Sequence, residues 1–246
     1  MPIVLVHGNP ETDAIWDDLR QHLGRDDVVA LSPPGFGSPV PDGFGATSDD
    51  YMVWLAAQLE GIQGPVDLVG HDWGGGHVFR LVNARPDLVR SWAIDLAGCF
   101  DPDYVWHDRA QVWQTPGAGE AAIAQQIATP VEQRALFYQK LGMSRHAAAS
   151  CAAAFNQDMG RCILALYRSA AQPKLAEWGA DLSGVRSRPG LVIIATEDHY
   201  TGGELLARRT AQRAGAQVAM LSGLGHWWMC QDPRRGADVL RPFVSD

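Results

Sequence analysis

A carboxylate occupies the position at which a strand–turn–helix pattern usually carries a nucleophile. The segment Gly70-His71-Asp72-Trp73-Gly74 has the form G-x-nucleophile-x-G, with aspartate in place of the more common serine. The nucleophile of such a turn takes a strained conformation with positive φ, and the flanking glycines let strand and helix approach closely. The turn also directs the backbone N–H of Trp73 toward the reacting centre. Taken alone, the pattern fits equally well an aspartate that caps a helix.

Three further segments weaken the helix-cap interpretation, because each of them follows an expected strand. His7-Gly8-Asn9-Pro10 stands where the second amide of an oxyanion hole would be supplied, and Gly223-Leu224-Gly225-His226 ends on a histidine. Ala195-Thr196-Glu197-Asp198 offers an acid. Nucleophile, acid and histidine therefore follow one another in the order of a catalytic triad of this kind. The predicted triad consists of Asp72, Asp198 and His226.

The choice of aspartate as nucleophile narrows the reaction. Attack of a carboxylate on a carbonyl carbon would give an anhydride, which is an unfavourable intermediate. Attack on an sp³ carbon that bears a leaving group gives an ordinary ester, which water can then hydrolyse. Asp72 therefore favours displacement at carbon, either the opening of an epoxide or the removal of a halide.

The remaining candidates have roles in the hydrolysis of that ester. His226 would act as general base on water, oriented by Asp198 or, as the alternative acid, by Glu197. The backbone amides of Asn9 and Trp73 would form the oxyanion hole for the negative charge that develops when water attacks.

The segments between these candidates are typical of an α/β fold. Short apolar, β-branched runs predict buried parallel strands at residues 3–6, 28–31, 66–69, 94–97, 191–195 and 218–221. Apolar residues at helical spacing predict helices from about 48 to 62, directly after Asp72, and from about 234 to 243. Because strands alternate with helices, we predict a doubly wound, mostly parallel sheet.

The stretch from 101 to 184 interrupts this alternation. It contains no convincing strand, is rich in helix-forming residues and carries several aromatic side chains. We predict a helical cap at 101–184 above the carboxyl ends of the strands, where open α/β sheets bind ligands. Residues 1–100 and 185–246 would form the core. The expected substrate pocket has walls of Trp106, Trp113 and Trp227.

The composition excludes several classes of partner. The chain has 246 residues and a formal net charge of −8, so neither nucleic acid nor a membrane surface is an expected partner. It has no run of about 18 apolar residues, and its start, MPIVLVHG, lacks the basic residues of a signal peptide. Four cysteines without CxxC spacing predict reduced thiols in a cytoplasmic protein. We expect no cofactor and no metal, and the sequence leaves monomer and homodimer open.

Taken together, these motifs resemble those of the aspartate-nucleophile branch of the α/β-hydrolase superfamily, which contains epoxide hydrolases and haloalkane dehalogenases. Residues 70–75 are similar to the GHDWGG elbow, 7–10 to the HGxP motif, whose proline is cis, and 33–37 to the PGFG loop. The resemblance covers nearly the whole chain and implies an α/β-hydrolase fold with a short helical cap. The chain begins at what would be the third strand, so an N-terminally shortened fold is expected.

Two cap segments resemble those of the epoxide hydrolases in particular. Tyr167-Arg168-Ser169 is similar to a signature whose tyrosine donates to the epoxide oxygen, and residues 112–120 are similar to a stretch of the form YFQ-x-PG-x-AE. The second tyrosine of that family would lie near Arg109. The resemblance therefore implies that His107 or Tyr104 replaces it, or that Tyr167 acts as the single donor. The alternative for Tyr167 is an aromatic that only packs in the cap.

The dehalogenase alternative depends on two residues. In haloalkane dehalogenases an asparagine at the position of Asn9 and the tryptophan at the position of Trp73 both bind halide, although epoxide hydrolases share the tryptophan. The cap similarity spans two separate segments, so we expect an epoxide hydrolase that takes a small apolar epoxide and water. A non-catalytic small-molecule receptor is the third reading, and an intact triad argues against it.

Overall fold

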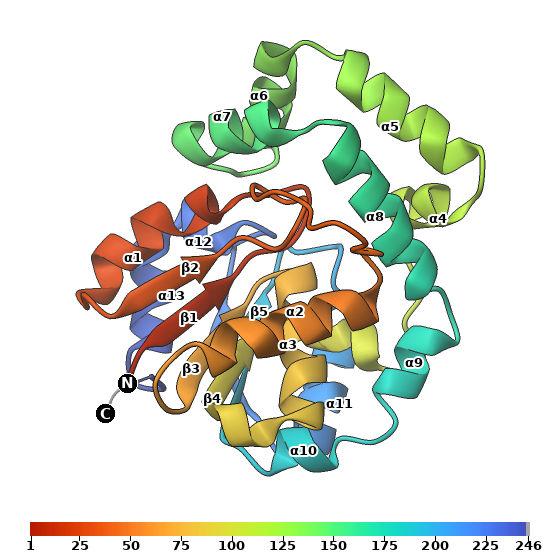
Figure 1. Ribbon diagram of the computed structural model, residues 1–246. Helices are drawn as coiled ribbons and strands as arrows, with labels where there is room; N and C mark the ends of the chain where they lie inside the picture. The colour runs from red at the N-terminus through yellow and green to blue at the C-terminus, as the bar shows by residue number, and fades with distance from the viewer. Residues whose placement is uncertain (245–246) are drawn as a thin grey trace.

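Six parallel strands form one sheet in the computed structural model, which describes residues 1–244 (Figure 1). The strands are β1 (Ile3–Val6), β2 (Val28–Leu31), β3 (Val66–Gly70), β4 (Val89–Ile94), β5 (Gly190–Ala195) and β6 (Gln217–Leu221). They lie in the order β2-β1-β3-β4-β5-β6, and every neighbouring pair is parallel. Five of the six strands agree with the prediction to within one residue at each end, which confirms the predicted parallel sheet.

The exception is β4, which lies earlier in the chain than predicted. We expected a strand at 94–97, whereas β4 ends at Ile94. Arg90 and Ser91 concealed the strand, because their polar side chains interrupt the apolar run on which the prediction depended. Both hydrogen-bond the buried carboxylate of Asp67 on β3, which makes their place in the sheet tolerable.

Helices cover both faces of the sheet, as predicted for a doubly wound fold. On one face pack α1 (Asp17–Leu23), α12 (Trp228–Gln231) and α13 (Pro233–Leu240), and on the other α2 (Ser48–Glu60), α3 (Trp73–Ala84) and α11 (Gly203–Ala214). Successive strand residues point to opposite faces, so Val4 and Val6 join one apolar core while Ile3 and Leu5 join the other. The site described below lies at the carboxyl ends of the strands, between these two cores.

The connection from β4 to β5 consists of helices and loops. Its helices are α4 (Asp108–Gln114), α5 (Ala118–Ala128), α6 (Val131–Lys140), α7 (Arg145–Ala154), α8 (Gln157–Ser169), α9 (Lys174–Trp178) and α10 (Ser183–Arg186), preceded by a 3₁₀ turn at Ala97–Phe100. Figure 1 shows α4 to α8 as a layer above the sheet, while α9 and α10 lie lower, beside the core. We keep the division into a core and a cap at 101–184 as a proposal.

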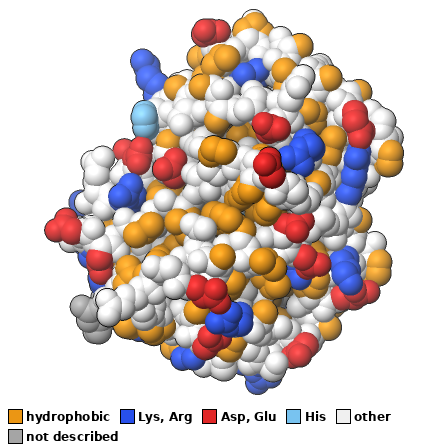
Figure 2. Space-filling model, viewed as in Figure 1, with side chains coloured by type: hydrophobic (Ala, Val, Ile, Leu, Met, Phe, Trp, Pro, Cys, Tyr) orange, Lys and Arg blue, Asp and Glu red, His pale blue; other side chains and the backbone are white. Residues whose placement is uncertain are grey.

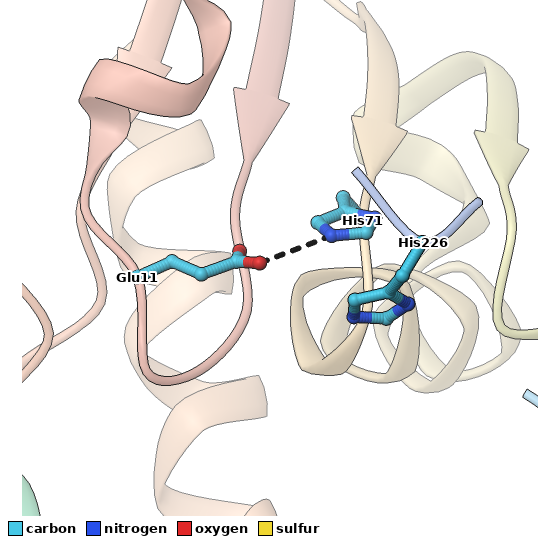
Figure 3. Close-up of side chains that lie close together, drawn as sticks. All are labelled: Glu11, His71 and His226. Carbon is cyan, nitrogen blue, oxygen red and sulfur yellow. Dashed lines mark hydrogen bonds and ion pairs between the residues drawn. The ribbon is translucent and has the colours of Figure 1, made fainter. Parts of the chain in front are cut away.

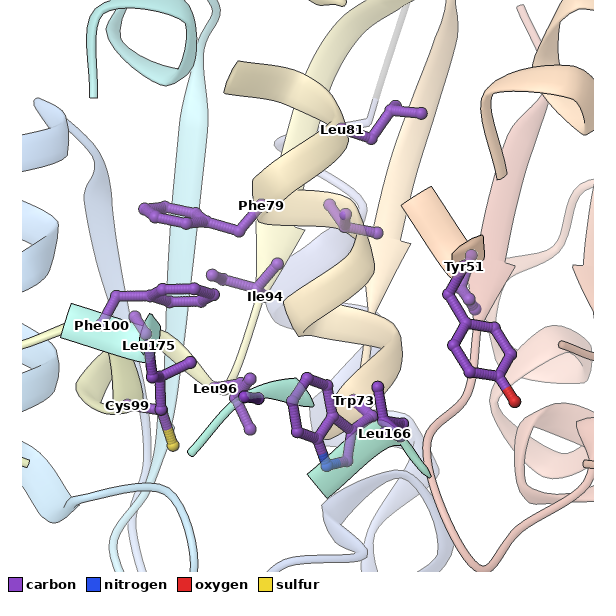
Figure 4. Close-up of a cluster of buried hydrophobic side chains, with 14 of the residues drawn as sticks. Tyr51, Trp73, Phe79, Leu81, Ile94, Leu96, Cys99, Phe100, Leu166 and Leu175 are labelled. Carbon is purple, nitrogen blue, oxygen red and sulfur yellow. The ribbon is translucent and has the colours of Figure 1, made fainter. Parts of the chain in front are cut away.

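Helix α8 joins this layer to the core. It buries Met159, Ile163 and Leu166, which recur at helical spacing, in the same apolar cluster as the side chains of α3. Figure 4 shows Leu166 in this cluster together with Trp73 and Phe79 of α3. Because the cluster is continuous, it holds Tyr167, which is also a residue of α8, in a defined position against Trp73 at the start of α3.

The surface carries charges of both signs. On the face shown in Figure 2, acidic and basic side chains are interspersed. No helix within residues 1–244 has both the length and the apolar character that crossing a membrane requires.

Candidate active site

Asp72 stands at a sharp turn between β3 and α3. Its backbone has φ of 48° and ψ of −129°, which is the strained positive-φ conformation predicted for the elbow. A Cβ atom on Gly74 would collide with the backbone oxygen of Val6, so only glycine lets α3 approach β1 this closely. A Cβ atom on Gly8 would collide with the carboxylate of Asp72 itself. The two glycines therefore permit the packing that brings the loop after β1 against the nucleophile.

That loop supplies a donor to the nucleophile. The backbone N–H of Asn9 donates to Oδ1 of Asp72 over 3.0 Å, and the Nδ2 atom of Asn9 lies 3.5 Å from the same oxygen. The Asn9–Pro10 peptide bond is cis. Trp73 is the first residue of α3, so its N–H belongs to the free donors of a helix start. The structure thus brings Asn9 and Trp73 together on the two sides of Asp72.

His226 and Asp198 complete a triad geometry with Asp72. The Nδ1 atom of His226 lies 2.9 Å from Oδ2 of Asp198, whose other oxygen accepts the backbone N–H of Tyr200 at 2.8 Å. The Nε2 atom of His226 lies 3.8 Å from Oδ2 of Asp72. Glu197, the alternative acid, is exposed and hydrogen-bonds the neighbouring Thr196. Of the two candidate acids, Asp198 is therefore the one that contacts the imidazole of His226.

Burial shapes the acidity of all three groups. It raises the pKa of Asp72 to about 6, against the opposing charge of His226. Burial alone would raise the pKa of Asp198 and lower that of His226. Their mutual attraction outweighs burial, so the pKa of Asp198 lies below and that of His226 above the ordinary value. Asp72 is thus a carboxylate that is ionised at neutral pH but poorly solvated, which suits a nucleophile.

A buried ionic network behind the nucleophile was not predicted from the sequence. His71 lies between two carboxylates, with Nδ1 2.5 Å from Oδ2 of Asp95 and Nε2 3.1 Å from Oε1 of Glu11. The other oxygen of Asp95 accepts the backbone N–H of Asp72 at 3.0 Å. Figure 3 shows Glu11, His71 and His226 close together. The network therefore holds the backbone of the elbow through Asp95 and places charge next to His226.

The two tryptophans that follow His226 are tied to the same network. Trp227 donates its indole N–H to Glu11 at 2.5 Å, and Trp228 donates to Asp95 at 2.7 Å. Glu11 also accepts the backbone N–H of Gly8 at 2.8 Å. Both carboxylates are thus fully hydrogen-bonded, and they anchor the histidine loop to the elbow.

Glu11, His71 and His226 present ligand atoms within 4.8 Å of one another, as in a metal site. Burial would lower the pKa of His71, but Asp95 and Glu11 outweigh it and raise that pKa well above the ordinary value. His71 in turn lowers the pKa of Glu11 to about 2, against the effect of burial. Both ring nitrogens of His71 are engaged, one with Asp95 and the other with Glu11, so the described residues form an ion-pair network here.

A narrow cavity of about 60 Å³ lies in front of Asp72. Its floor includes Asn9, Asp72 and His226 from the core, and its walls include side chains of α4, α5, α6 and α8. Trp113 and Trp227 line it, as expected. Trp106 is not among the lining residues, contrary to expectation: its ring stacks on Trp73 at a centroid distance of 5.8 Å, and its indole N–H donates to the backbone oxygen of Ala170.

The three residues predicted as donors to a leaving group differ in whether they line the cavity. Tyr167 lines the cavity, with its ring edge on Trp73 at a centroid distance of 5.5 Å. His107 also lines the cavity. Tyr104 does not: its hydroxyl donates to the backbone oxygen of Tyr200 at 2.9 Å. Tyr104 is therefore committed to the loop that carries Asp198.

Comparison with known proteins decides the family. Residues 3–239 match the model of the family described as Alpha/beta hydrolase family. The chain is an α/β hydrolase.

Relatives of this α/β hydrolase include enzymes with different chemistry. Lipase LipV of Mycobacterium tuberculosis is 36% identical over 88 residues, which are 35% of this chain and 33% of the lipase. A haloalkane dehalogenase of Mesorhizobium japonicum is 28% identical over 132 residues, 49% of this chain and 42% of that enzyme. The matched regions thus span less than half of these curated relatives.

A solved structure covers more of the chain. The haloalkane dehalogenase DbeA from Bradyrhizobium elkani aligns over 99% of this chain and 89% of its own, with a TM-score of 0.74 and 19% identity. This likeness shows that the α/β-hydrolase fold is shared along the chain.

Proposed function

We propose that this α/β hydrolase is an epoxide hydrolase, which opens an epoxide to a vicinal diol through an ester on Asp72. The observation that supports this proposal most is the place of Tyr167, an O–H donor in the cavity of the nucleophile. An epoxide oxygen leaves as an alkoxide unless a donor stabilises it, whereas a halide leaves without a proton. The identity of the donor therefore separates the two reactions that an aspartate nucleophile favours.

The hydroxyl of Tyr167 lies within reach of the side chains of Asn9 and Trp73 and of the charge of Asp72. Burial raises the pKa of this phenol well above its ordinary value, the charge of Asp72 raises it further, and hydrogen bonding by Asn9 and Trp73 opposes both. An indole N–H can only donate, so the phenol oxygen accepts from Trp73 and retains its own proton as a donor. The side chains that would bind a halide thus contact a tyrosine hydroxyl instead, which favours the epoxide reaction.

His107 supports the proposal as a second donor. Its Nδ1 atom accepts the backbone N–H of Ala110 at 3.2 Å, so in the neutral imidazole the proton is on Nε2. Burial lowers the pKa of His107 to about 4, and the charges of His226 and Arg109 contribute, which keeps the ring neutral at physiological pH. The result is an N–H donor of fixed tautomer on the wall that faces Asp72.

The proposed reaction has two steps. In the first, an oxygen of Asp72 attacks an epoxide carbon, the C–O bond breaks and Tyr167 donates a proton to the departing oxygen. In the second, His226 removes a proton from water, which attacks the carboxyl carbon of Asp72, breaks the ester and releases the diol. The proton taken up by His226 then replaces, by way of water, the one that Tyr167 donated, so both side chains return to their starting forms. The N–H groups of Asn9 and Trp73 stabilise the oxyanion of this second step.

Haloalkane dehalogenation is the second candidate. It is favoured by Asn9, whose Nδ2 atom lies beside the nucleophile, and by the haloalkane dehalogenases among the relatives and solved structures. The same triad would serve that reaction, with Asn9 and Trp73 as halide donors.

A panel of small epoxides and haloalkanes, with diol and halide release both followed, tests the proposal. We expect diol formation from epoxides at a kcat/KM at least about 100-fold above that for halide release. Fast halide release without measurable diol would assign the dehalogenase reaction instead.

Tyr167→Phe should slow opening of the epoxide by about 100-fold or more, because it removes a donor that stabilises charge in the transition state. Substrate binding should change little, since the ring remains. Pre-steady-state alkylation rates measure this effect, and Asn9→Ala is the matched comparison. A Tyr167→Phe enzyme that opens epoxides at the wild-type rate, or an Asn9→Ala enzyme with a selective loss of halide release from 1,2-dibromoethane, would favour the second candidate.

The fall of kcat/KM at low pH should follow the protonation of Asp72. Only its ionised form can attack, and burial raises its pKa to about 6. As pH falls through that value, kcat/KM for the epoxide should drop by about tenfold per pH unit. The measurement is kcat/KM from pH 4.5 to 8.5, with circular dichroism to show that the fold persists. A profile that stays flat down to pH 4.5 would be inconsistent with this role of Asp72.

A further inference from the structure

Arg109 lines the same cavity as Asp72 and takes no chemical step in the reaction described above. We propose that it binds a carboxylate of the substrate, so that the preferred substrate is a short-chain epoxy acid, not an uncharged epoxide. For the reacting group this inference rests on the proposed function, whereas the anion site rests on Arg109 and its neighbours.

The position of Arg109 is defined by aromatic rings. It lies on α4 and lines the cavity that contains Asp72. Its guanidinium carbon lies 5.9 Å from the ring centroid of Trp113 and 5.8 Å from that of Phe137. Within residues 1–244 no carboxylate lies within 4.0 Å of this guanidinium, and its hydrogen-bond donors have no protein acceptor. Arg109 is an exposed residue, so its cation lies at the solvent side of these rings and is not neutralised by a carboxylate of the described residues.

The charge of Arg109 contributes to the pKa values of two side chains that line the cavity. Burial is the main cause of the lowered pKa of His107 and of the raised pKa of Tyr138, and the guanidinium contributes to the first shift and opposes the second. Both groups line the same cavity. A negative charge in the cavity would therefore be attracted by Arg109, although solvent partly screens this exposed cation.

A second donor stands beside the cation. The side-chain amide of Gln126 donates to the hydroxyl oxygen of Tyr138 at 2.9 Å, so the proton of this hydroxyl is left to donate. Gln126 and Tyr138 line the cavity together with Arg109. A guanidinium with an adjacent hydroxyl matches the two oxygens of a carboxylate.

This donor set and Asp72 line one cavity. Among its described lining residues Asp72 is the only acid. A cavity of about 60 Å³ admits a substrate of only a few carbon atoms. A short acid with its carboxylate at Arg109 would present its distal carbon atoms to Asp72, which fixes the orientation of the substrate.

The test compares an epoxy acid with a neutral epoxide of similar size. We expect kcat/KM for 3,4-epoxybutanoate to exceed that for 1,2-epoxybutane by about 10- to 100-fold, the range of a hydrogen bond to a charged group. Arg109→Gln should abolish this preference, measured as the ratio of the two kcat/KM values on the same variant, so that any effect of the substitution on the shared reaction cancels. Arg145→Gln, which removes an exposed charge of α7 outside the cavity, should retain the preference. An unchanged preference in Arg109→Gln, or no preference in the wild type, would overturn the inference.

Binding of unreactive ligands separates this inference from the proposed function. If neither epoxide is turned over, the proposed function fails, and calorimetry with butanoate and butanamide still tests the anion site. In the Asp72→Ala background we expect butanoate to bind at least about tenfold more tightly than butanamide, and Arg109→Gln should remove the difference. Equal affinity of the two ligands, or a difference that survives Arg109→Gln, would contradict the assignment to Arg109.

Discussion

Asp72→Ala is expected to abolish turnover, by about 10⁴-fold or more, while the protein remains folded. The loss follows because no other side chain in the cavity can form the covalent ester: Asp72 is the only carboxylate among its described lining residues, and Asp198 is directed at His226. Steady-state diol formation measures the loss. A variant that keeps more than about 1% of wild-type activity would show that Asp72 is not the nucleophile.

The same substitution should stabilise the fold at alkaline pH. Burial raises the pKa of Asp72 to about 6 from an ordinary value of 3.8, so its ionised form destabilises the folded state by up to about 3 kcal/mol. This cost is absent below about pH 4, grows between pH 4 and 6 and is complete above pH 6. Asp72→Ala should therefore melt at a higher temperature than the wild type at pH 8, and the difference should shrink toward pH 4. A variant that melts at a lower temperature at pH 8 would contradict this reading.

His226→Gln is expected to separate the two steps of the reaction. Alkylation of Asp72 does not need a base, whereas hydrolysis of the ester does, and losing a general base slows that step by about 10²- to 10⁴-fold. The ester should accumulate. Intact-mass analysis should show the mass of the enzyme plus one substrate.

Two acids next to each other in the chain provide the control for this result. Asp198→Asn should slow hydrolysis strongly, because Asp198 holds the Nδ1 side of His226 at 2.9 Å. Glu197→Gln should have little effect, since that side chain is exposed. An unmodified mass in folded His226→Gln under excess epoxide, or the reverse order of the two acids, would reassign these roles.

The sequence predicts the frame of the site well, for a physical reason. Strands buried on both faces are nearly uninterrupted apolar runs, and the elbow requires glycines whose spacing is set by close backbone contacts, such as that of Gly74 with Val6. Each of these local requirements produces a recognisable pattern in the amino-acid sequence. The candidates at the strand ends could therefore be placed before any contact between them was known.

The network behind the nucleophile could not be predicted in the same way. Glu11, His71 and Asp95 come from three separate segments, and their meaning lies in contacts among them. The misplaced strand hid one of the signals, because Asp95 then fell inside the expected strand 94–97 and not at its end. Glu11 directly follows the segment 7–10. An acid so close to a predicted strand end was the one signal in the sequence that could have indicated this part of the network.

The donors of the cap show a second limit. The resemblance left His107 and Tyr104 as equal replacements for a missing tyrosine, and nothing in the local sequence distinguishes them. In the structure Tyr104 uses its proton on the backbone of Tyr200, while His107 accepts from Ala110 and faces the cavity. The difference depends on how the loop before α4 meets the loop of Asp198, which is a tertiary property.

A single turnover in ¹⁸O-labelled water tests the central claim most directly. With enzyme in excess over epoxide, water attacks the carboxyl carbon of Asp72 and not the substrate, so one ¹⁸O atom should remain in the peptide that contains Asp72. The diol of this first turnover should carry no label. Label in the diol together with an unlabelled Asp72 peptide would mean direct attack of water on the epoxide and would contradict the covalent mechanism.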